Sequence, residues 1–138
     1  MAKAFEKRAN ILLVEDEPLI SAVATEALQE QGFAVHAVAS AAEALRCLSS
    51  RESIDVLFTD VNLAGGMDGG ALAQRARELR PGLPIMYTSG RQHAIEALDP
   101  VEGSMFVRKP YDPFDLGRLL DYLVTSKLIS APRKAPVG

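Results

Sequence analysis

Cysteine, long apolar runs and excess positive charge are all scarce in this sequence. Its single cysteine, Cys47, excludes an internal disulfide and any metal site built from several cysteines. No apolar run approaches the ~20 residues that a bilayer-spanning helix needs. Residues 1–10 mix basic and acidic side chains and lack the apolar stretch of a secretory signal peptide. We therefore expect a cytoplasmic protein that does not contact a membrane.

The charge balance argues against a nucleic-acid partner. The 138 residues carry a formal net charge of −3, so no basic field attracts a phosphate backbone. Hydrophobic residues make up 48% and charged residues 24%, a mix typical of one globular domain. We expect an N-terminal extension over 1–9, a domain over 10–126, and a flexible tail over 127–138 with no output domain.

Short apolar runs alternate with helical patterns along the chain. Runs of the kind expected for buried strands occur over 11–14, 33–38, 54–59, 83–87 and 104–108. Apolar residues recur at helical spacing between these runs and after the last one, and the span 91–99 is the weakest of these helices. Five βα units in series predict an α/β fold, a doubly wound parallel five-stranded sheet with helices on both faces.

Polar side chains stand where the predicted strands end. Glu15 and Asp16 follow the first strand, Asp60 ends the third, Thr88 ends the fourth and Lys109 follows the fifth. Ligands bind at this edge of open parallel sheets. Converging carboxylates repel one another unless a cation lies among them, and oxygen ligands without cysteine or histidine favour Mg²⁺. A lysine and a hydroxyl beside that ion would suit a phosphoryl group.

Five segments resemble the successive motifs of response-regulator receiver domains. In order along roughly residues 10 to 125 they read ILLVEDEP, FTDVNL, MDG, YTSG and FVRKP. The resemblance implies a flavodoxin-like (βα)5 fold with strand order 2-1-3-4-5. It also implies a stand-alone receiver of two-component and phosphorelay signalling, with no enzymatic activity beyond Mg²⁺-dependent self-phosphorylation and self-dephosphorylation.

The same resemblance assigns roles to individual residues. The counterpart of Asp60 takes a phosphoryl group from a sensor histidine kinase or a histidine phosphotransfer protein. Thr88 and Lys109 would hold the phosphoryl oxygens. The implied Mg²⁺ ligands are Glu15, Asp16, Asp60 and the backbone carbonyl of Asn62.

Three features depart from the family pattern. Glu15 stands where aspartate is frequent, and its longer side chain reaches the ion through water. The loop after Asp60 is one residue longer than in chemotaxis-type receivers and lacks their proline, which alters the rim of the site. Phe106 stands where tyrosine is common, so switching cannot depend on a phenolic hydroxyl.

Switching is expected to begin at Thr88 and to involve Phe106. The hydroxyl of Thr88 can bond locally or swing toward phosphoryl oxygens, and Phe106 can turn inward without burying an unpaired polar group. We expect the readout surface for a downstream protein around residues 91–122, which include the weakest helix, in a monomer or weak dimer.

Two other functions remain open for this pattern. Aspartyl-phosphate phosphatases also use Asp, Thr, Lys and Mg²⁺ on a parallel sheet. They typically need a second acid two residues after the nucleophile, and that position is Asn62 here. A degenerate receiver would bind partners without phosphorylation, but the residues that phosphorylation needs are all retained, namely Asp16, Asp60, Thr88 and Lys109.

The remaining reactive side chains favour structural roles. Cys47 lies within a helical pattern and is predicted to be a packed thiol, not a nucleophile. His36 and His93 fall in separate elements with no apparent catalytic partner.

Overall fold

Strands and helices alternate throughout residues 8–130, the part of the chain that the computed structural model describes. Its strands are β1 (Asn10–Val14), β2 (Ala34–Val38), β3 (Val56–Asp60), β4 (Ile85–Ser89) and β5 (Met105–Arg108). Its helices are α1 (Pro18–Glu30), α2 (Ala41–Ser49), α3 (Gly69–Leu79), α4 (Gln92–Ala97) and α5 (Pro113–Ser130). The predicted alternation of five strands and five helices is confirmed.

The five strands form one parallel sheet in the order β2-β1-β3-β4-β5. This is the flavodoxin-like order that the resemblance implied. From β1 the chain continues to β2 on one side of β1 and then crosses back to β3 on its other side. The direction in which strands are added to the sheet therefore reverses between β1 and β3. Such a reversal opens a crevice at the carboxyl ends of the strands, where ligands bind in doubly wound sheets.

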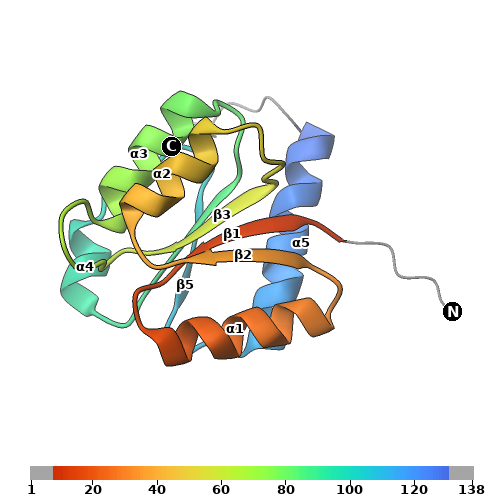
Figure 1. Cartoon of the computed structure of the whole chain (residues 1–138), viewed down its shortest axis with the longest axis horizontal. Helices are drawn as coiled ribbons and strands as arrows, with labels where there is room; N and C mark the ends of the chain where they lie inside the picture. Colours follow the sequence, from red (N-terminus) through yellow and green to blue (C-terminus); the bar gives the residue numbers. More distant parts are fainter. Residues whose placement is uncertain (1–7, 131–138) are drawn as a thin grey trace, which may run out of the picture.

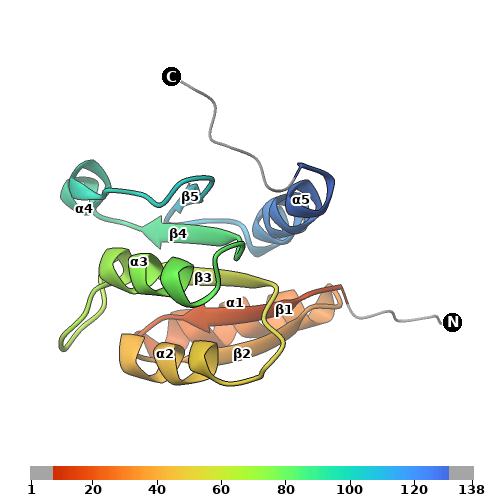
Figure 2. The same cartoon turned by 90° about the horizontal axis from the view of Figure 1, so that it is seen from above.

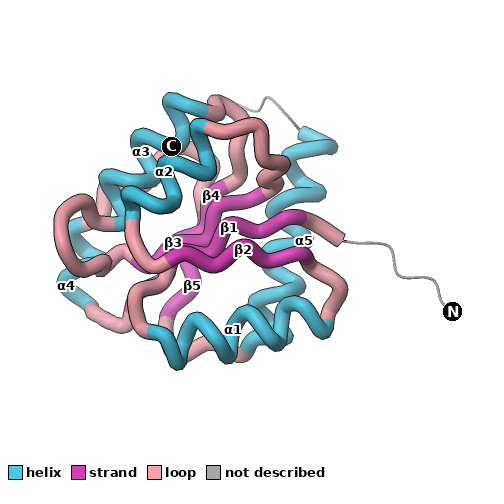
Figure 3. Tube along the Cα trace, viewed as in Figure 1, coloured by secondary structure: helices cyan, strands magenta, loops and turns pink. Residues whose placement is uncertain are grey.

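Helices cover both faces of the sheet, which forms the middle layer (Figures 1 and 3). One core cluster joins α1 and α5 to the sheet through Leu28 and Leu120, both fully buried. The other joins α2 and α3 to the opposite face through Leu48 and Leu72. Seen from above, α4 lies beyond β4 at the end of the fold away from α5 (Figure 2).

Polar side chains fix the starts of three helices. Ser40 caps α2 by accepting a hydrogen bond from the amide of Glu43 at 3.2 Å. Asp68 caps α3 through the amide of Ala71 at 2.8 Å. Asp112 accepts from the amide of Phe114 at 2.9 Å at the start of α5. These caps satisfy amides that have no partner within their own helix.

Several predicted element boundaries are shifted by one or two residues, among them the third strand, expected over 54–59 and observed as Val56–Asp60. The fourth strand was expected over 83–87 and runs instead over Ile85–Ser89, because Leu83 donates to the carbonyl of Arg80 in a turn at 3.0 Å. The last helix runs to Ser130, and the domain boundary expected at 126 stays a prediction. Residues 1–7 and 131–138, parts of the predicted extension and tail, lie outside the described residues. No helix within residues 8–130 is long and apolar enough to span a bilayer.

Candidate functional site

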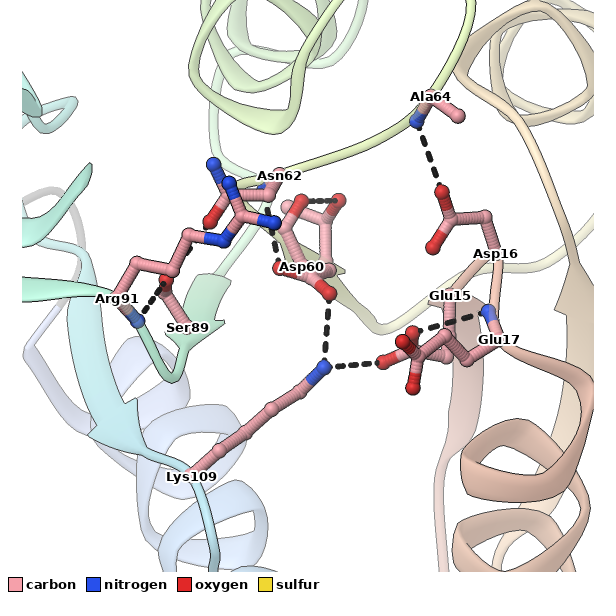
Figure 4. Close-up of polar contacts among 10 residues, drawn as sticks. Glu15, Asp16, Glu17, Asp60, Asn62, Ala64, Ser89, Arg91 and Lys109 are labelled. Atoms are coloured by element: carbon pink, nitrogen blue, oxygen red, sulfur yellow. Dashed lines mark hydrogen bonds and ion pairs between the residues drawn. The ribbon is translucent and has the colours of Figure 1, made fainter.

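The predicted site residues meet at the carboxyl edge of the sheet. Asp60 is the last residue of β3, and Thr88 is its register partner on β4. Glu15 and Asp16 follow β1 directly, on the other side of β3. Lys109 follows β5 and extends its side chain across the edge toward Asp60 and Glu15 (Figure 4). Four separate strand ends therefore supply one small group of polar side chains.

The ammonium of Lys109 bridges two buried carboxylates. Its Nζ atom lies 2.8 Å from Oδ2 of Asp60 and 2.9 Å from Oε1 of Glu15. The other oxygens of these carboxylates accept backbone hydrogen bonds, Oδ1 of Asp60 from the amide of Asn62 at 2.9 Å and Oε2 of Glu15 from that of Glu17 at 3.2 Å. Charge-assisted hydrogen bonds of this length hold the carboxylates of Asp60 and Glu15 in fixed orientations.

Burial and charge act against each other at this pair. Burial raises the pKa of Glu15, and the nearby charge of Asp60 adds to the rise, while hydrogen bonds from Lys109 and Glu17 offset only part of it. Burial alone would lower the pKa of Lys109, but its hydrogen bonds to Asp60 and Glu15 outweigh that effect and raise it. The lysine therefore stays cationic between the two acids.

The carboxylates are close enough to share a divalent ion. One oxygen each from Glu15, Asp16 and Asp60 lie within 4.8 Å of one another. Asp16 holds its place through Oδ2, which accepts a hydrogen bond from the amide of Ala64 at 2.8 Å. This all-oxygen donor set with excess negative charge fits Mg²⁺ and offers nothing to softer metals.

Thr88 adds a hydroxyl that has no partner within the described residues. The residue is 2% exposed, and its Oγ1 atom makes no hydrogen bond there. A buried hydroxyl without a partner costs about 1–3 kcal/mol. Thr88 is the register partner of Asp60 on β4, so this unpartnered hydroxyl belongs to the residue next to that aspartate across the sheet.

A short hydrogen-bonded chain on the other side of Asp60 was not predicted. Ser89 donates through Oγ to Oδ1 of Asn62 at 2.9 Å and accepts from the amide of Arg91 at 3.0 Å. The side chain of Arg91 points back toward Asn62 (Figure 4). The sequence placed Ser89 beside Thr88 but gave no signal that Arg91, at the start of α4, would reach this edge.

An open pocket of about 580 Å³ lies over these groups. Four carboxylates line it with only two cationic side chains, and those six are Asp16, Glu17, Asp60, Asp68, Arg91 and Lys109. Since a water molecule occupies about 30 Å³ of liquid, the pocket has room for a hydrated cation and a phosphoryl group together. Asn62 lines it as well.

Phe106 lies away from the pocket, on the face covered by α3 and α4. It is half-buried and packs against the core cluster that contains Tyr87, its register partner on β4. The hydroxyl oxygen of Tyr87 accepts a hydrogen bond from the amide of Val101 at 3.0 Å, which ties β4 to the segment after α4. The structure therefore does not bring Phe106 into contact with the acidic group.

Cys47 is packed as predicted, and His36, for which the sequence showed no catalytic partner, lies next to it. Cys47 is buried, as its helical pattern predicted, and burial raises the pKa of its thiol. His36 lies beside it, with Nδ1 3.8 Å from the sulfur. The exposed His93 lies on α4.

Curated proteins with similar sequences are longer than this chain. Transcriptional regulatory protein GlrR of Escherichia coli (strain K12) is 29% identical over 117 residues, which is 83% of this chain and 26% of GlrR. Sensor kinase CckA of Brucella abortus (strain 2308) is 35% identical over 106 residues, 75% of this chain and 11% of CckA. The chain thus spans about a quarter or less of these two relatives.

Solved structures match over almost their whole length. A response regulator receiver protein from Sinorhizobium medicae WSM419 is 32% identical with a TM-score of 0.81, over 88% of this chain and 98% of that one. Response regulator protein TrrA from Thermotoga maritima, in complex with Mg(2+)-BeF, is 25% identical with a TM-score of 0.70, over 83% and 98%. The family model of the response regulator receiver domain matches residues 11–121, and the chain therefore belongs to that family.

Proposed function

We propose that Asp60 is the phosphoacceptor of this receiver and that Mg²⁺ is bound beside it during transfer. One oxygen of Asp60 forms a bond to phosphorus while the bond between phosphorus and a histidine nitrogen of the donor breaks. The imidazole keeps that electron pair and takes up a proton from water. The product on Asp60 is an acyl phosphate, formed without a change in oxidation state.

Lys109 and Thr88 are the groups that would hold the transferred oxygens. The Lys109 ammonium is already 2.8 Å from Oδ2 of Asp60, and it can pair with a phosphoryl oxygen without leaving the pocket. The unpartnered hydroxyl of Thr88 can donate to another of these oxygens. Positioned donors of this kind are the main contribution that a protein makes to phosphoryl transfer.

The ligands proposed for Mg²⁺ are Asp16, Asp60, the backbone carbonyl of Asn62 and, through water, Glu15. Both oxygens of Glu15 already accept hydrogen bonds within the chain, which agrees with a water-mediated role. When bound, Mg²⁺ supplies positive charge against the phosphoryl oxygens in a pocket where carboxylates are in excess. The structure of TrrA with Mg(2+)-BeF supports the same ion for this chain.

The observation that carries this proposal is the contact between Lys109 and Asp60 inside an acidic pocket. A phosphatase of the aspartyl-phosphate class would need an acid two residues after Asp60. That residue is Asn62, whose Oδ1 accepts a hydrogen bond from Ser89 and so belongs to an amide held in place. The pocket edge thus favours a phosphoryl switch over a hydrolase.

The donor would be a sensor histidine kinase or a histidine phosphotransfer protein, and the phosphorylated receiver would act on a downstream protein. We place the readout surface on residues 91–122, from α4 to α5. The six-residue helix α4 has no buried residue, as expected of an element that shifts at little cost. Phe114 and Tyr122 are 60% and 64% exposed on α5 and offer apolar area to a partner.

Phosphorylation can be tested without knowing the donor. The chain is incubated with Mg²⁺ and acetyl phosphate, and its intact mass is measured. We expect one added phosphoryl group, absent in Asp60→Asn and retained in Asp55→Asn, whose carboxylate lies at the opposite end of the sheet against the amide of Asn10. Full phosphorylation of Asp60→Asn would refute the assignment.

A further inference from the structure

A second group of ligating side chains lies where β2 and α2 face each other, away from the acidic pocket. His36 is on β2, Cys47 on α2, and Glu52 in the segment after α2. Nδ1 of His36 is 3.2 Å from Oε1 of Glu52 and 3.8 Å from Sγ of Cys47. One ligand atom from each of the three lies within 4.8 Å of the others.

These distances match the edges of a tetrahedral metal site. Zinc bonds are about 2.0–2.1 Å long to nitrogen and oxygen and about 2.3 Å long to sulfur. In a tetrahedral site, these bond lengths separate a nitrogen ligand from an oxygen ligand by about 3.4 Å and from a sulfur ligand by about 3.6 Å. The observed separations of 3.2 and 3.8 Å differ from these by only a few tenths of an ångström. Sγ of Cys47 lies almost as close to Nε2 of His36, at 3.9 Å, so the imidazole must turn to direct Nδ1 at an ion shared with the sulfur.

The segment that carries Glu52 is tied to the turn that carries Cys47. Ser50 donates through Oγ to the carbonyl of Cys47 and accepts at the same atom from the amide of Glu52 at 3.1 Å. These bonds hold two of the three ligands together without using their ligating atoms. Supporting contacts of this kind orient the residues of metal sites.

Burial differs among the three side chains in a way that suits an ion reached from solvent. Cys47 is 9% exposed and lies in the core cluster under α2. The side chains of His36 and Glu52 are 50% and 46% exposed. An ion held by the sulfur on its inner side would keep an open outer position for water, the fourth ligand of a three-residue site.

We propose that His36, Cys47 and Glu52 bind a divalent transition-metal ion of the Zn²⁺ type. Nitrogen, sulfur and carboxylate oxygen together are the donors of zinc sites, whereas Mg²⁺ takes oxygen alone. Binding releases the thiol proton to solvent. The bound ion would link the edge strand β2 to α2, at the opposite end of the sheet from β5.

Cobalt absorption tests the site directly, because Co²⁺ replaces Zn²⁺ and reports a sulfur ligand through a charge-transfer band. The full chain is titrated with Co²⁺ in excess Mg²⁺, which occupies the carboxylate pocket, and Zn²⁺ is then added as competitor. We expect one equivalent of Co²⁺ with tetrahedral visible bands and a sulfur band, both removed by Zn²⁺. The bands should persist in Asp60→Asn, which alters only the phosphoacceptor pocket.

Ligand variants decide whether these three residues are responsible. Cys47→Ser should lose the sulfur band. His36→Gln and Glu52→Gln should each weaken Zn²⁺ binding roughly a hundredfold, because losing a ligand should cost at least as much affinity as losing a contact that supports a ligand. His93→Gln is the matched control, since His93 is the other histidine of the chain and lies exposed on α4. It should bind as the unmodified chain does.

Melting temperatures without metal identify any variant whose fold is disturbed, and the exposed Glu52→Gln keeps the test valid if Cys47→Ser does not fold. The proposal is overturned if Co²⁺ gives no sulfur band in the unmodified chain. It is equally overturned if His36→Gln and Glu52→Gln bind Zn²⁺ as tightly as His93→Gln, which would leave His36 and Glu52 a surface ion pair beside a packed thiol.

Discussion

Gly69 packs against the backbone of Asp60 so closely that no side chain fits between them. A Cβ atom at Gly69 would lie 2.0 Å from the carbonyl oxygen of Asp60 and 2.8 Å from its carbonyl carbon. The amide of Gly69 donates to the carbonyl of Val61 at 2.8 Å, so the start of α3 is held against the end of β3. The position of the Asp60 backbone therefore depends on a glycine nine residues later.

Gly69→Ala should destabilise the fold and slow phosphorylation. The new methyl group meets backbone atoms that cannot rotate away, and overpacking of this kind costs about 1–3 kcal/mol. Gly70→Ala is the matched control, because the nearest atom to its Cβ is the flexible Leu98 Cδ1 at 3.3 Å. Urea unfolding and phosphorylation by acetyl phosphate measure both variants. Equal stability of the two would show that α3 moves away freely.

Lys109→Ala should slow phosphorylation roughly a hundredfold, the usual cost of losing one positioned donor. Without its ammonium, Asp60 and Glu15 repel each other, so the free energy of unfolding should also fall in chelator and recover in part when Mg²⁺ is added. Arg108→Ala is the control, since this neighbour is exposed on β5. A phosphorylation rate unchanged in Lys109→Ala would contradict the role of the contact between Lys109 and Asp60.

Chelation of Mg²⁺ should abolish phosphorylation, because the pocket holds more carboxylates than cations and repels a dianionic donor. Asp16→Ala should lower Mg²⁺ affinity at least tenfold, as measured by calorimetry. The matched control Asp99→Ala removes an exposed carboxylate in the segment after α4. Equal phosphorylation in chelator and in millimolar Mg²⁺ would contradict this prediction, as would full affinity in Asp16→Ala.

Tyr111→Phe should lose less stability at alkaline pH than the unmodified chain does. Burial, with the charge of Glu15 next in effect, raises the pKa of Tyr111 from 10.0 to about 12. The unfolded phenol ionises first, so this stabilisation is complete below about pH 10 and lost as the pH rises toward 12. Between about pH 9 and about pH 11, the free energy of unfolding should fall by about 1 kcal/mol more in the unmodified chain than in Tyr111→Phe.

Denaturant unfolding at the two pH values measures this difference. Lysine deprotonation affects both chains alike, and Tyr122→Phe, on a residue 64% exposed, provides the control. If Tyr111→Phe and Tyr122→Phe respond equally to pH, the phenol of Tyr111 is not the group responsible.

The order of elements was predictable because each strand leaves a local signature. β1, β3 and β4 are buried on both faces apart from Asn10, and their apolar runs stand out from the helical patterns. The end of β4 was predicted too early because of Thr88 and Ser89, which are polar yet 2% and 0% exposed. Polar residues are buried there because the site lies at the strand end, so a hydrophobicity pattern places that end too early.

The site was predictable only as far as topology determines it. Parallel strands bring their carboxyl ends together, and this suffices to place Asp60 near Asp16 and Lys109. The hydrogen bond from Ser89 to Asn62 depends instead on the path of the loop before α4. The proximity of His36 to Cys47 depends on how α2 packs on the edge strand. These distances depend on how the side chains of different elements pack together, and a local sequence pattern does not predict that packing.

Thr88, the register partner of Asp60, has a buried hydroxyl that lacks a partner in residues 8–130. Thr88→Val keeps the shape and removes the unpaired hydroxyl, so the unphosphorylated chain should gain about 1 kcal/mol of stability. A loss of stability in Thr88→Val would mean that the hydroxyl already has a partner, such as a bound water. Chemical denaturation of both chains decides this.

Phosphorylation should reverse this difference in stability, because the phosphoryl group supplies the acceptor that the Thr88 hydroxyl lacks. Thr88→Ala should still accept phosphate on Asp60 but lose most of the phosphorylation-dependent change in residues 91–122. The change would pass from β4 through Tyr87, whose hydroxyl accepts from the amide of Val101 after α4. Thr88→Ser retains the hydroxyl and should retain the change. Amide hydrogen exchange that shifts as much in Thr88→Ala as in Thr88→Ser would exclude this route and leave the phosphorylation site itself unaffected.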